Sequence, residues 1–360
     1  MSTVTKAYRF ALDPSPSQRR ALASHCGAAR VAHNWGLALV KARLDEHQAD
    51  PSIRIPWTLP ELRREWNRSK DEVAPWWAEN SKESYSSGLD GLARALRNWS
   101  HSRTGRRKGP AVGFPRCKRK GRSRDACRFT TGAIKVLPDR KHVQLPRIGV
   151  LKTHESTRKL ARRLEQGTAR ILGATISRTA DRWYVSYTVE VEQQAPARNG
   201  KATVVGVDVG IRHLAVLSTG EDPVPNPRAL ERSLRKLRRL NRQLARRRSC
   251  SRRRKLARRR LACLHARAAN LRSDALHKLT TTLATKYGTV VVEQLNVAGL
   301  RRNHALARAL ADSGMGRLRH LLTYKTDWYA VGWSWRRVST FLRQVPSGIT
   351  VSWRGPPSAG

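Results

Sequence analysis

The chain has 360 residues and carries 72 Lys and Arg against 26 Asp and Glu, a net charge of +46 and a pI of about 11.6. Such a protein repels itself unless a polyanion neutralises it, so the composition favours nucleic acid as the partner. No apolar run approaches the roughly 18 residues of a membrane-spanning helix, and residues 1–14 lack a signal-peptide core, so we expect a cytoplasmic protein without a membrane partner, bound to the nucleoid when it holds DNA. The five cysteines contain no Cys-x-x-Cys pair, so neither a disulfide framework nor a zinc site can be drawn from them.

The first hundred residues predict a strand followed by helices. A short strand is expected over 6–12, and the Pro14–Ser17 break places Ser17 as the N-cap of a helix that runs from Gln18 to His25. Further helices are expected over 28–45, 59–68 and 81–99. The tryptophans of this region fall at helical spacing, which favours core packing over base stacking.

Between residues 103 and 128 the composition shifts to Gly, Pro, Ser, Arg and Lys. The segment is either a solvated linker or a phosphate-contacting loop, and its charge density favours the loop. The candidate nucleic-acid-binding residues are Arg106, Arg107, Lys108, Lys118, Arg119, Lys120 and Arg122. Strands are expected over 128–130, 133–137, 142–145, 169–178 and 182–191, and these predict a small antiparallel barrel or sheet that the amino-terminal strand could complete.

After a Pro/Gly-containing linker at 196–200, two apolar strands each deliver one carboxylate. Asp208 lies within the Val-rich run that opens this region, and Glu293 ends a second run at 289–293. Acids at neighbouring strand ends are the ligands that Mg²⁺ prefers, and such a site can activate water against a phosphodiester. We therefore assign Asp208 and Glu293 as catalytic and metal-binding residues; the alternative is a turn or cap residue and an ordinary strand-end charge.

Residues 228–277 predict two basic antiparallel helices with an apolar Leu stripe and a break near 249–251. Arginine clusters can be no more than a solvated face, but so many with so few acids favour contact with a phosphate backbone. The candidates are Arg246, Arg247, Arg248, Arg252, Arg253, Arg254, Arg258, Arg259 and Arg260.

From Tyr8 to about Tyr329 the chain resembles the OrfB/TnpB family of transposon-encoded RNA-guided nucleases, which are related to the type V CRISPR effectors. In that comparison Asp208 and Glu293 match the first two RuvC-type catalytic acids. The remaining motifs are Tyr8-Arg9-Phe10, Gly27–Trp35, Ser81–Tyr85, Phe114–Lys120 and Tyr324–Tyr329.

The resemblance implies an α/β fold with all-β and helical parts. It assigns an oligonucleotide-binding-type β-barrel to 1–14 and 112–196, and a helical insert with its basic linker to 15–111. It assigns an RNase H-like (RuvC) domain with a long basic helical hairpin to 199–331, followed by an atypical tail at 332–360. It also implies a guide RNA, a DNA target with a short adjacent motif, and Mg²⁺ as the cofactor.

After the helix at 324–329 the family continues with an apolar strand, a cysteine-pair zinc ribbon and a third catalytic Asp, and this sequence shows none of them. Asp312 or Asp327 could complete the acid set, but both lie on a predicted helix. We interpret the departure as a frameshift near Ala330, because residues 333–336 read in the adjacent frame would give an apolar strand; the encoding DNA tests this.

We therefore expect a DNA endonuclease that is weak or inactive as encoded. The alternatives are a non-catalytic RNA- and DNA-binding protein, such as a guide-dependent repressor or a degenerate transposase relic, and a ribosomal or chromatin-like protein. The paired strand acids disfavour the last of these.

Overall fold

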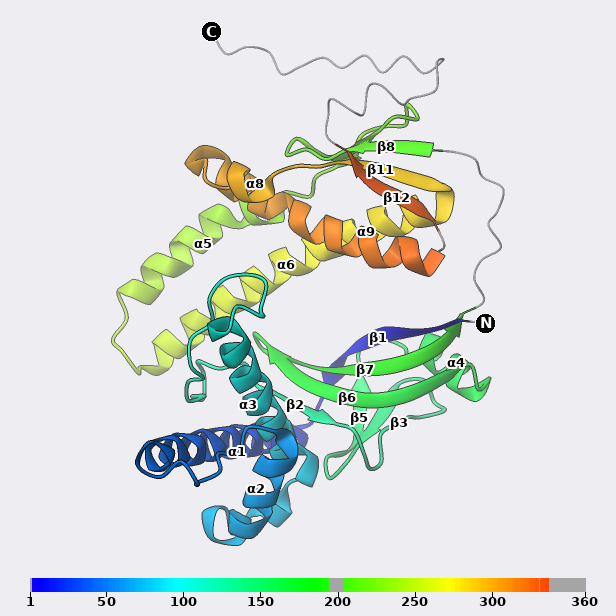
Figure 1. Ribbon diagram of the computed structural model, residues 1–360. Helices are drawn as coiled ribbons and strands as arrows, with labels where there is room; N and C mark the ends of the chain where they lie inside the picture. Colours follow the sequence, from blue (N-terminus) through cyan, green and yellow to red (C-terminus); the bar gives the residue numbers. More distant parts are fainter. Residues whose placement is uncertain (1, 194–203, 330, 337–360) are drawn as a thin grey trace. The chain divides into compact units, whose positions relative to one another are not determined.

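The computed structural model describes residues 2–193, 204–329 and 331–336, so the linker expected at 196–200 and most of the tail lie outside the described residues. The chain divides into two compact units, an amino-terminal unit over Thr3–Glu192 and a carboxy-terminal unit from Gln193 onward. Figure 1 labels the helices and strands of both units. Among the helices of the described residues, none combines the length and apolar character that a membrane crossing needs.

The described strands of the amino-terminal unit form one sheet in the order β2-β6-β7-β1-β5-β4-β3. Their bounds are β1 (Ser2–Asp13), β2 (Ala126–Phe129), β3 (Lys135–Val136), β4 (His142–Leu145), β5 (Gly149–Thr153), β6 (Ala169–Thr179) and β7 (Arg182–Gln193). The long β6–β7 hairpin pairs from Ala169↔Val191 to Thr179↔Arg182. β1, the first strand of the chain, lies in the middle of the sheet, as the pairing of Leu12 with Thr153 on β5 illustrates.

Helices α1 (Pro16–Ala49), α2 (Leu59–Val73) and α3 (Lys82–Arg103) pack around their own core. The predicted N-cap at Ser17 is wrong. Ser15 caps α1, because its hydroxyl accepts from Gln18 N at 3.3 Å while its own N–H donates to the Gln18 side chain at 2.9 Å. The predicted interruption after His25 is also wrong, because α1 is one continuous helix.

Two features complete this unit. A short helix, α4 (Arg158–Glu165), and the strand β5 are present although the sequence pattern did not predict them. The expectation that the tryptophans form core holds for Trp66, which stacks on Tyr85 with ring centroids 5.0 Å apart, but Trp76 is 49% exposed.

The described strands of the carboxy-terminal unit follow the order β10-β9-β8-β11-β12. Their bounds are β8 (Val204–Asp208), β9 (His213–Leu217), β10 (Val224–Pro225), β11 (Thr289–Glu293) and β12 (Gly332–Arg336). β8 and β9 are antiparallel, whereas β11 runs parallel to both of its neighbours, β8 and β12.

The strand expected to be missing after Tyr329 is present as β12, which pairs with β11 from Thr289↔Gly332 to Glu293↔Arg336. The Gly-Trp-Ser-Trp-Arg run lacks an aliphatic pattern, but aromatic residues favour extended backbone. At its start, a Cβ on Gly332 would lie 3.0 Å from Thr289 Oγ1, so a glycine suits this close approach. The frameshift interpretation therefore loses the missing strand as its support.

Helices α6 and α9 pack on the sheet and lie side by side, whereas α5 packs against α6 (Figure 1). The bounds of the helices are α5 (Ala229–Ala245), α6 (Arg252–Lys286), α7 (Val297–Leu300), α8 (His304–Ser313) and α9 (Met315–Tyr329). Buried side chains of β8, β11, α6 and α9 share one core, for example Val207, Val292 and Leu321. The predicted Leu stripe is only partly correct, because Leu256 and Leu271 are exposed.

Lys325 is a buried cation between α9 and α6, 5% exposed. Its Nζ donates to His277 O at 2.8 Å, Thr280 Oγ1 at 2.8 Å and Thr281 Oγ1 at 2.6 Å. Burial disfavours the charged amine and lowers the pKa of Lys325 to about 8. The folded unit thus holds this proton more weakly than the unfolded chain, where a Lys pKa is about 10.4.

Because its pKa differs between the folded and unfolded chain, Lys325 makes the unfolding free energy of this unit depend on pH. The Lys325→Met variant is expected to remove that dependence. The cost of the buried charge is fully present below about pH 8 and is relieved as the pH rises toward about 10.4, a change of about 1–3 kcal/mol. The difference in unfolding free energy between Lys325→Met and wild type should therefore favour the variant more at pH 7 than at pH 9.5. Denaturant unfolding at both pH values measures it, and an equal difference at the two would contradict the prediction.

Candidate nuclease site and basic surfaces

Two strand-end carboxylates meet at one edge of the carboxy-terminal sheet. β8 and β11 are parallel neighbours with Val207 opposite Val292, so Asp208 and Glu293 are the next residues at the same carboxyl end. Asp208 is exposed between the buried Val207 and Val209, because alternate strand residues face opposite sides. Asp208 is the last residue of β8, so it lies at the end of the sheet, as the sequence predicts, and it faces solvent.

The two acids influence one another electrostatically. The pKa of Glu293 is raised, first because the side chain is partly buried and second because the charge of Asp208 disfavours a second negative charge beside it. A divalent cation relieves this kind of repulsion, and carboxylate oxygens are its preferred donors. The pair thus fits a Mg²⁺ ion in chemistry and in placement.

No cluster of three or more His, Cys, Asp or Glu side chains suited to a metal occurs in the part of the chain that the structure describes. Asp327 is exposed on α9. Asp312, the other acid considered as a third ligand, is 4% exposed and engaged elsewhere, at the amino terminus of α5.

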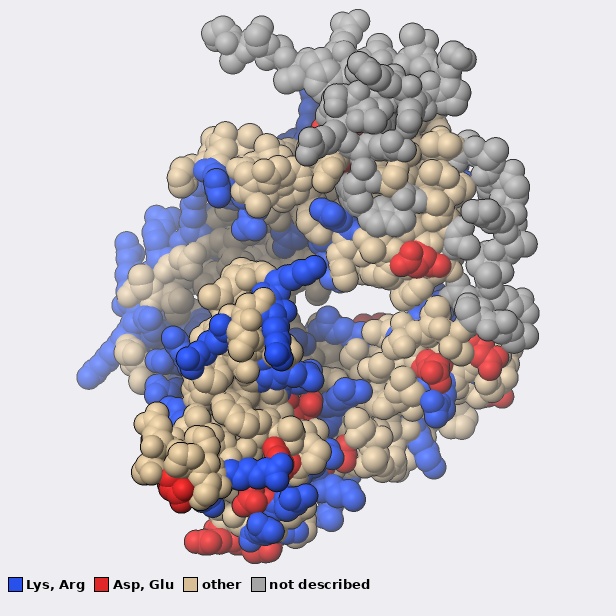
Figure 2. All heavy atoms as spheres, in the orientation of Figure 1, with Lys and Arg blue, Asp and Glu red and all other residues tan. Residues whose placement is uncertain are grey.

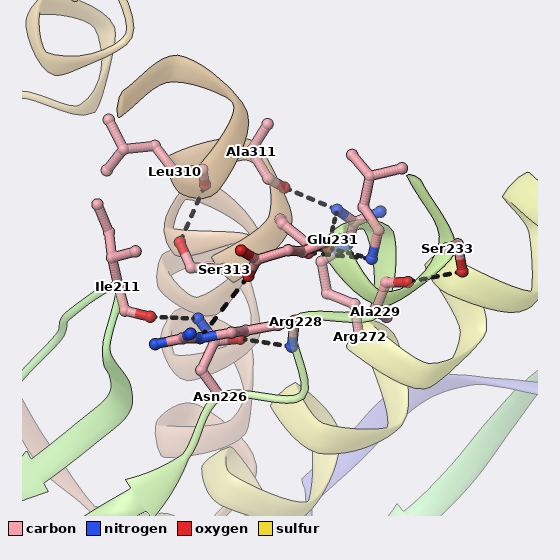
Figure 3. A network of polar contacts seen from close by, with 12 residues as sticks. Ile211, Asn226, Arg228, Ala229, Glu231, Ser233, Arg272, Leu310, Ala311 and Ser313 are labelled. Atoms are coloured by element: carbon pink, nitrogen blue, oxygen red, sulfur yellow. Dashed lines mark hydrogen bonds and ion pairs between the residues drawn. The ribbon is translucent and has the colours of Figure 1, made fainter. Parts of the chain in front are cut away.

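Asp312 anchors α8 to the basic hairpin. Its carboxylate accepts from Leu230 N at 3.0 Å with each oxygen and from Glu231 N at 3.1 Å, and it pairs with Arg272 of α6 at 3.6 Å. Arg272 also donates to Ala311 O at 2.7 Å (Figure 3). A negative charge at a helix amino terminus is favourable, so Asp312, which lies on α8, caps the amino terminus of α5. It is therefore not available as a metal ligand.

The hairpin of α5 and α6 carries the second group of candidate arginines. Figure 2 shows Lys and Arg side chains crowding over α5 and the turn into α6. Most of the nine are exposed, but Arg254 is partly buried and donates to Leu244 O at 2.6 Å and to Arg247 O at 2.8 Å. Arg254 therefore satisfies carbonyls at the end of α5. The charge pattern alone did not reveal this structural role.

The basic loop of the amino-terminal unit is held at one point by a motif residue of α1. Asn34 Oδ1 accepts from Lys118 N at 2.8 Å, and Asn34 Nδ2 donates to Lys118 O at 3.0 Å. Burial, assisted by the charge of Arg94, lowers the pKa of Lys118. The other basic candidates of the loop are exposed, except Arg107, which donates to Pro110 O at 2.8 Å.

The fold and the acid pair define a mixed helical and sheet protein with a strand-end carboxylate site. By sequence, the chain belongs to the OrfB family of IS605-type elements: the family model, described as a probable transposase, matches residues 186–304, and a helix-turn-helix model of that family matches 1–49. The resemblance inferred from the motifs is confirmed. In this chain the second match covers one strand and one continuous helix, β1 and α1.

The chain is similar to several putative RNA-guided DNA endonucleases. The chain is 41% identical over 342 residues to a putative RNA-guided DNA endonuclease of Mycobacterium tuberculosis, covering 90% of this chain and 74% of the relative. It is 28% identical over 341 residues to the putative RNA-guided DNA endonuclease InsQ of Escherichia coli, covering 90% and 78%. A solved Cas12f1–sgRNA–target DNA complex aligns over 93% of this chain and 89% of that chain, with a TM-score of 0.46 and 11% identity.

Proposed function

We propose that the protein is an RNA-guided DNA endonuclease of the transposon-encoded type. The observation that carries the proposal is the convergence of Asp208 and Glu293 on adjacent parallel strands of a chain with a net charge of +46. Family membership and the description shared by the relatives support the same function. The guide RNA and the target DNA are the partners that this proposal implies.

In this proposal the carboxy-terminal unit is an RNase H-like domain and the sheet of the amino-terminal unit is the oligonucleotide-binding part. The helices α1–α3 form the recognition insert. The exposed arginines of the α5–α6 hairpin and of the basic loop contact phosphates, so binding should weaken steeply as salt rises. Arg254 contributes through packing, because its guanidinium binds backbone carbonyls. Lys118 is partly buried, and its backbone is fixed by Asn34.

Asp208 and Glu293 would hold Mg²⁺. A bound Mg²⁺ supplies Lewis acidity and lowers the pKa of water, which is what phosphodiester hydrolysis needs. The residues of the chain fix the position of that chemistry, because both carboxylates project from the ends of paired strands in one rigid sheet. Exposure of Asp208 leaves this edge open to a nucleic-acid strand.

A second candidate function is guided binding without cleavage. The specific observation in its favour is that, within the described residues, only the Asp208–Glu293 pair is brought together and no third ligand joins it. Two carboxylates bind a divalent cation more weakly than three, so cleavage would fall while the basic surfaces remain intact.

The test uses the full-length protein with its guide RNA and a matched DNA target. Asp208→Asn and Glu293→Gln should each abolish Mg²⁺-dependent cleavage and weaken Mn²⁺ binding by at least about tenfold, since each removes one charged ligand. Asp327→Asn, which removes an exposed acid of α9, is the matched control and should change neither. DNA binding should survive in all three.

Wild-type protein that binds guided DNA and does not cut it would favour the second function. Cleavage that persists in Asp208→Asn would overturn the proposed site.

A further inference from the structure

A pocket of about 280 Å³ opens directly beside Glu293. One wall comes from the end of β11 and the chain that leads into α7, including Asn296. The opposite wall is the first turn and a half of α9, with Met315, Gly316 and Arg319. All of these residues belong to the carboxy-terminal unit, so one rigid neighbourhood supplies both the carboxylate and the pocket.

The walls of the pocket are of two kinds. Val209, Val292 and Leu318 line it and are themselves buried, so they form a fixed apolar floor. Gln294 and Asn296 add amide groups at the rim, where they are exposed. Its volume is just below the range of about 300–1,000 Å³ that suits drug-sized ligands, so the pocket fits one base with its sugar.

The charges at the rim suit a phosphate. Arg319 and Glu293 line the same pocket, and a guanidinium binds a phosphate group in a planar, bidentate manner. A phosphodiester attached to a nucleoside in the pocket would lie near the Asp208–Glu293 pair. Under the proposed function the strand at this edge is DNA, so the expected occupant is a deoxynucleoside.

We propose that this pocket receives one nucleoside of the DNA strand to be cut, with Arg319 as a positioning residue that contacts the adjoining phosphate. The inference rests on the proposed function and deepens it, because it names the feature that would set the cut strand in register with the two carboxylates. A strand so held would keep its scissile phosphate beside the two carboxylates.

Gly316 provides a way to fill the pocket. A Cβ on Gly316 meets no heavy atom within 4 Å, so a larger side chain can be accommodated there without displacing the backbone. Gly316→Leu should therefore obstruct the pocket in a folded protein. Arg317, two residues before Arg319 on the same helix, is exposed and does not line the pocket, which makes Arg317→Ala the matched control for charge.

The experiment is photocrosslinking of the full-length protein to a single-stranded DNA oligonucleotide that carries 5-iodo-deoxyuridine, in Ca²⁺, with peptide mapping by mass spectrometry. The readout does not require cleavage. We expect crosslinks in peptides that contain residues 294–298 or 315–319. Their yield should fall by about tenfold in Gly316→Leu and Arg319→Ala, about 1.4 kcal/mol, be partly restored in Arg319→Lys, and stay unchanged in Arg317→Ala.

Crosslinks that map elsewhere, that survive both Gly316→Leu and Arg319→Ala, or that Arg317→Ala reduces as strongly would overturn the pocket assignment. An RNA oligonucleotide of the same sequence that crosslinks there more strongly would overturn the assignment to DNA. Loss of Mn²⁺ binding in Asp208→Asn tests the proposed function separately. If Asp208→Asn loses Mn²⁺ binding but the crosslinks lie elsewhere, the pocket assignment alone is wrong. If Asp208→Asn keeps Mn²⁺ binding and no crosslink maps to the pocket, the proposed function itself fails.

Discussion

The Gly88→Ala variant is expected to destabilise the amino-terminal unit by about 3 kcal/mol or more. Gly88 lies on α3 where this helix crosses α1, and a Cβ there would be 2.1 Å from Ala29 O and 2.9 Å from Ala29 C. Both are backbone atoms, so the helices must move apart to admit one methyl group. Overpacking of this kind costs about 1–3 kcal/mol, and more where the backbone cannot yield.

Gly91→Ala, one turn later on the same helix, is the matched control. The nearest atom to its Cβ is Lys118 Nζ at 3.2 Å, the movable end of a long side chain. Because Ala favours a helix over Gly by about 1 kcal/mol, Gly91→Ala should be neutral or stabilising. Denaturant unfolding followed by tryptophan fluorescence compares the two, since Trp66 is buried in this core. Equal midpoints for Gly88→Ala and wild type would contradict the predicted clash.

The second large effect is expected at Asp312. Replacing it with Ala leaves the amino terminus of α5 without its acceptor and Arg272 without its carboxylate. Removing one partner of a buried ion pair costs about 3–5 kcal/mol. Since Arg272 is 25% exposed, we expect Asp312→Ala to lower the unfolding free energy of the carboxy-terminal unit by about 2–4 kcal/mol. Asp312→Asn keeps an acceptor oxygen for the N–H groups and should lose less.

Hydrogen exchange locates the effect of Asp312→Ala, because amides in the first turn of α5 should exchange faster than in wild type. Asp274→Ala is the control. Asp274 pairs with Lys278 at 2.8 Å, but the two side chains are 60% and 76% exposed, so its loss should cost less than about 1 kcal/mol. If both variants lose the same stability, the capping role of Asp312 is refuted.

Elements with strong local patterns could be predicted from the sequence. The strands that end in Asp208 and Glu293 are dense in Val, and the single carboxylate that each run delivers at its end predicted that the two acids share a site. The turn between α5 and α6 was also correctly located, because Ser251 offers a cap that accepts from Arg254 N at 3.1 Å. These signals act within a few residues.

Features that depend on distant partners could not be predicted. β5 is short, and one of its neighbours is β1, so its five residues give little local evidence of a strand. The role of Asp312 depends on backbone N–H groups about 80 residues away in the chain. Ser15 is the N-cap because it and Gln18 bond each other reciprocally. The sequence offers two nearby serines, Ser15 and Ser17, and does not show which of them makes that bond.

The central position of β1 has a consequence for how the protein is made. β1 leaves the ribosome before the other strands of its sheet, yet its neighbours there are β5 and β7, and β7 ends at Gln193. At a synthesis rate of about 5–20 residues per second, this strand waits roughly 10–35 s for its last partner. During that interval its hydrogen-bonding groups are open to other chains, so slower translation or a bulky amino-terminal fusion should increase aggregation of the nascent protein.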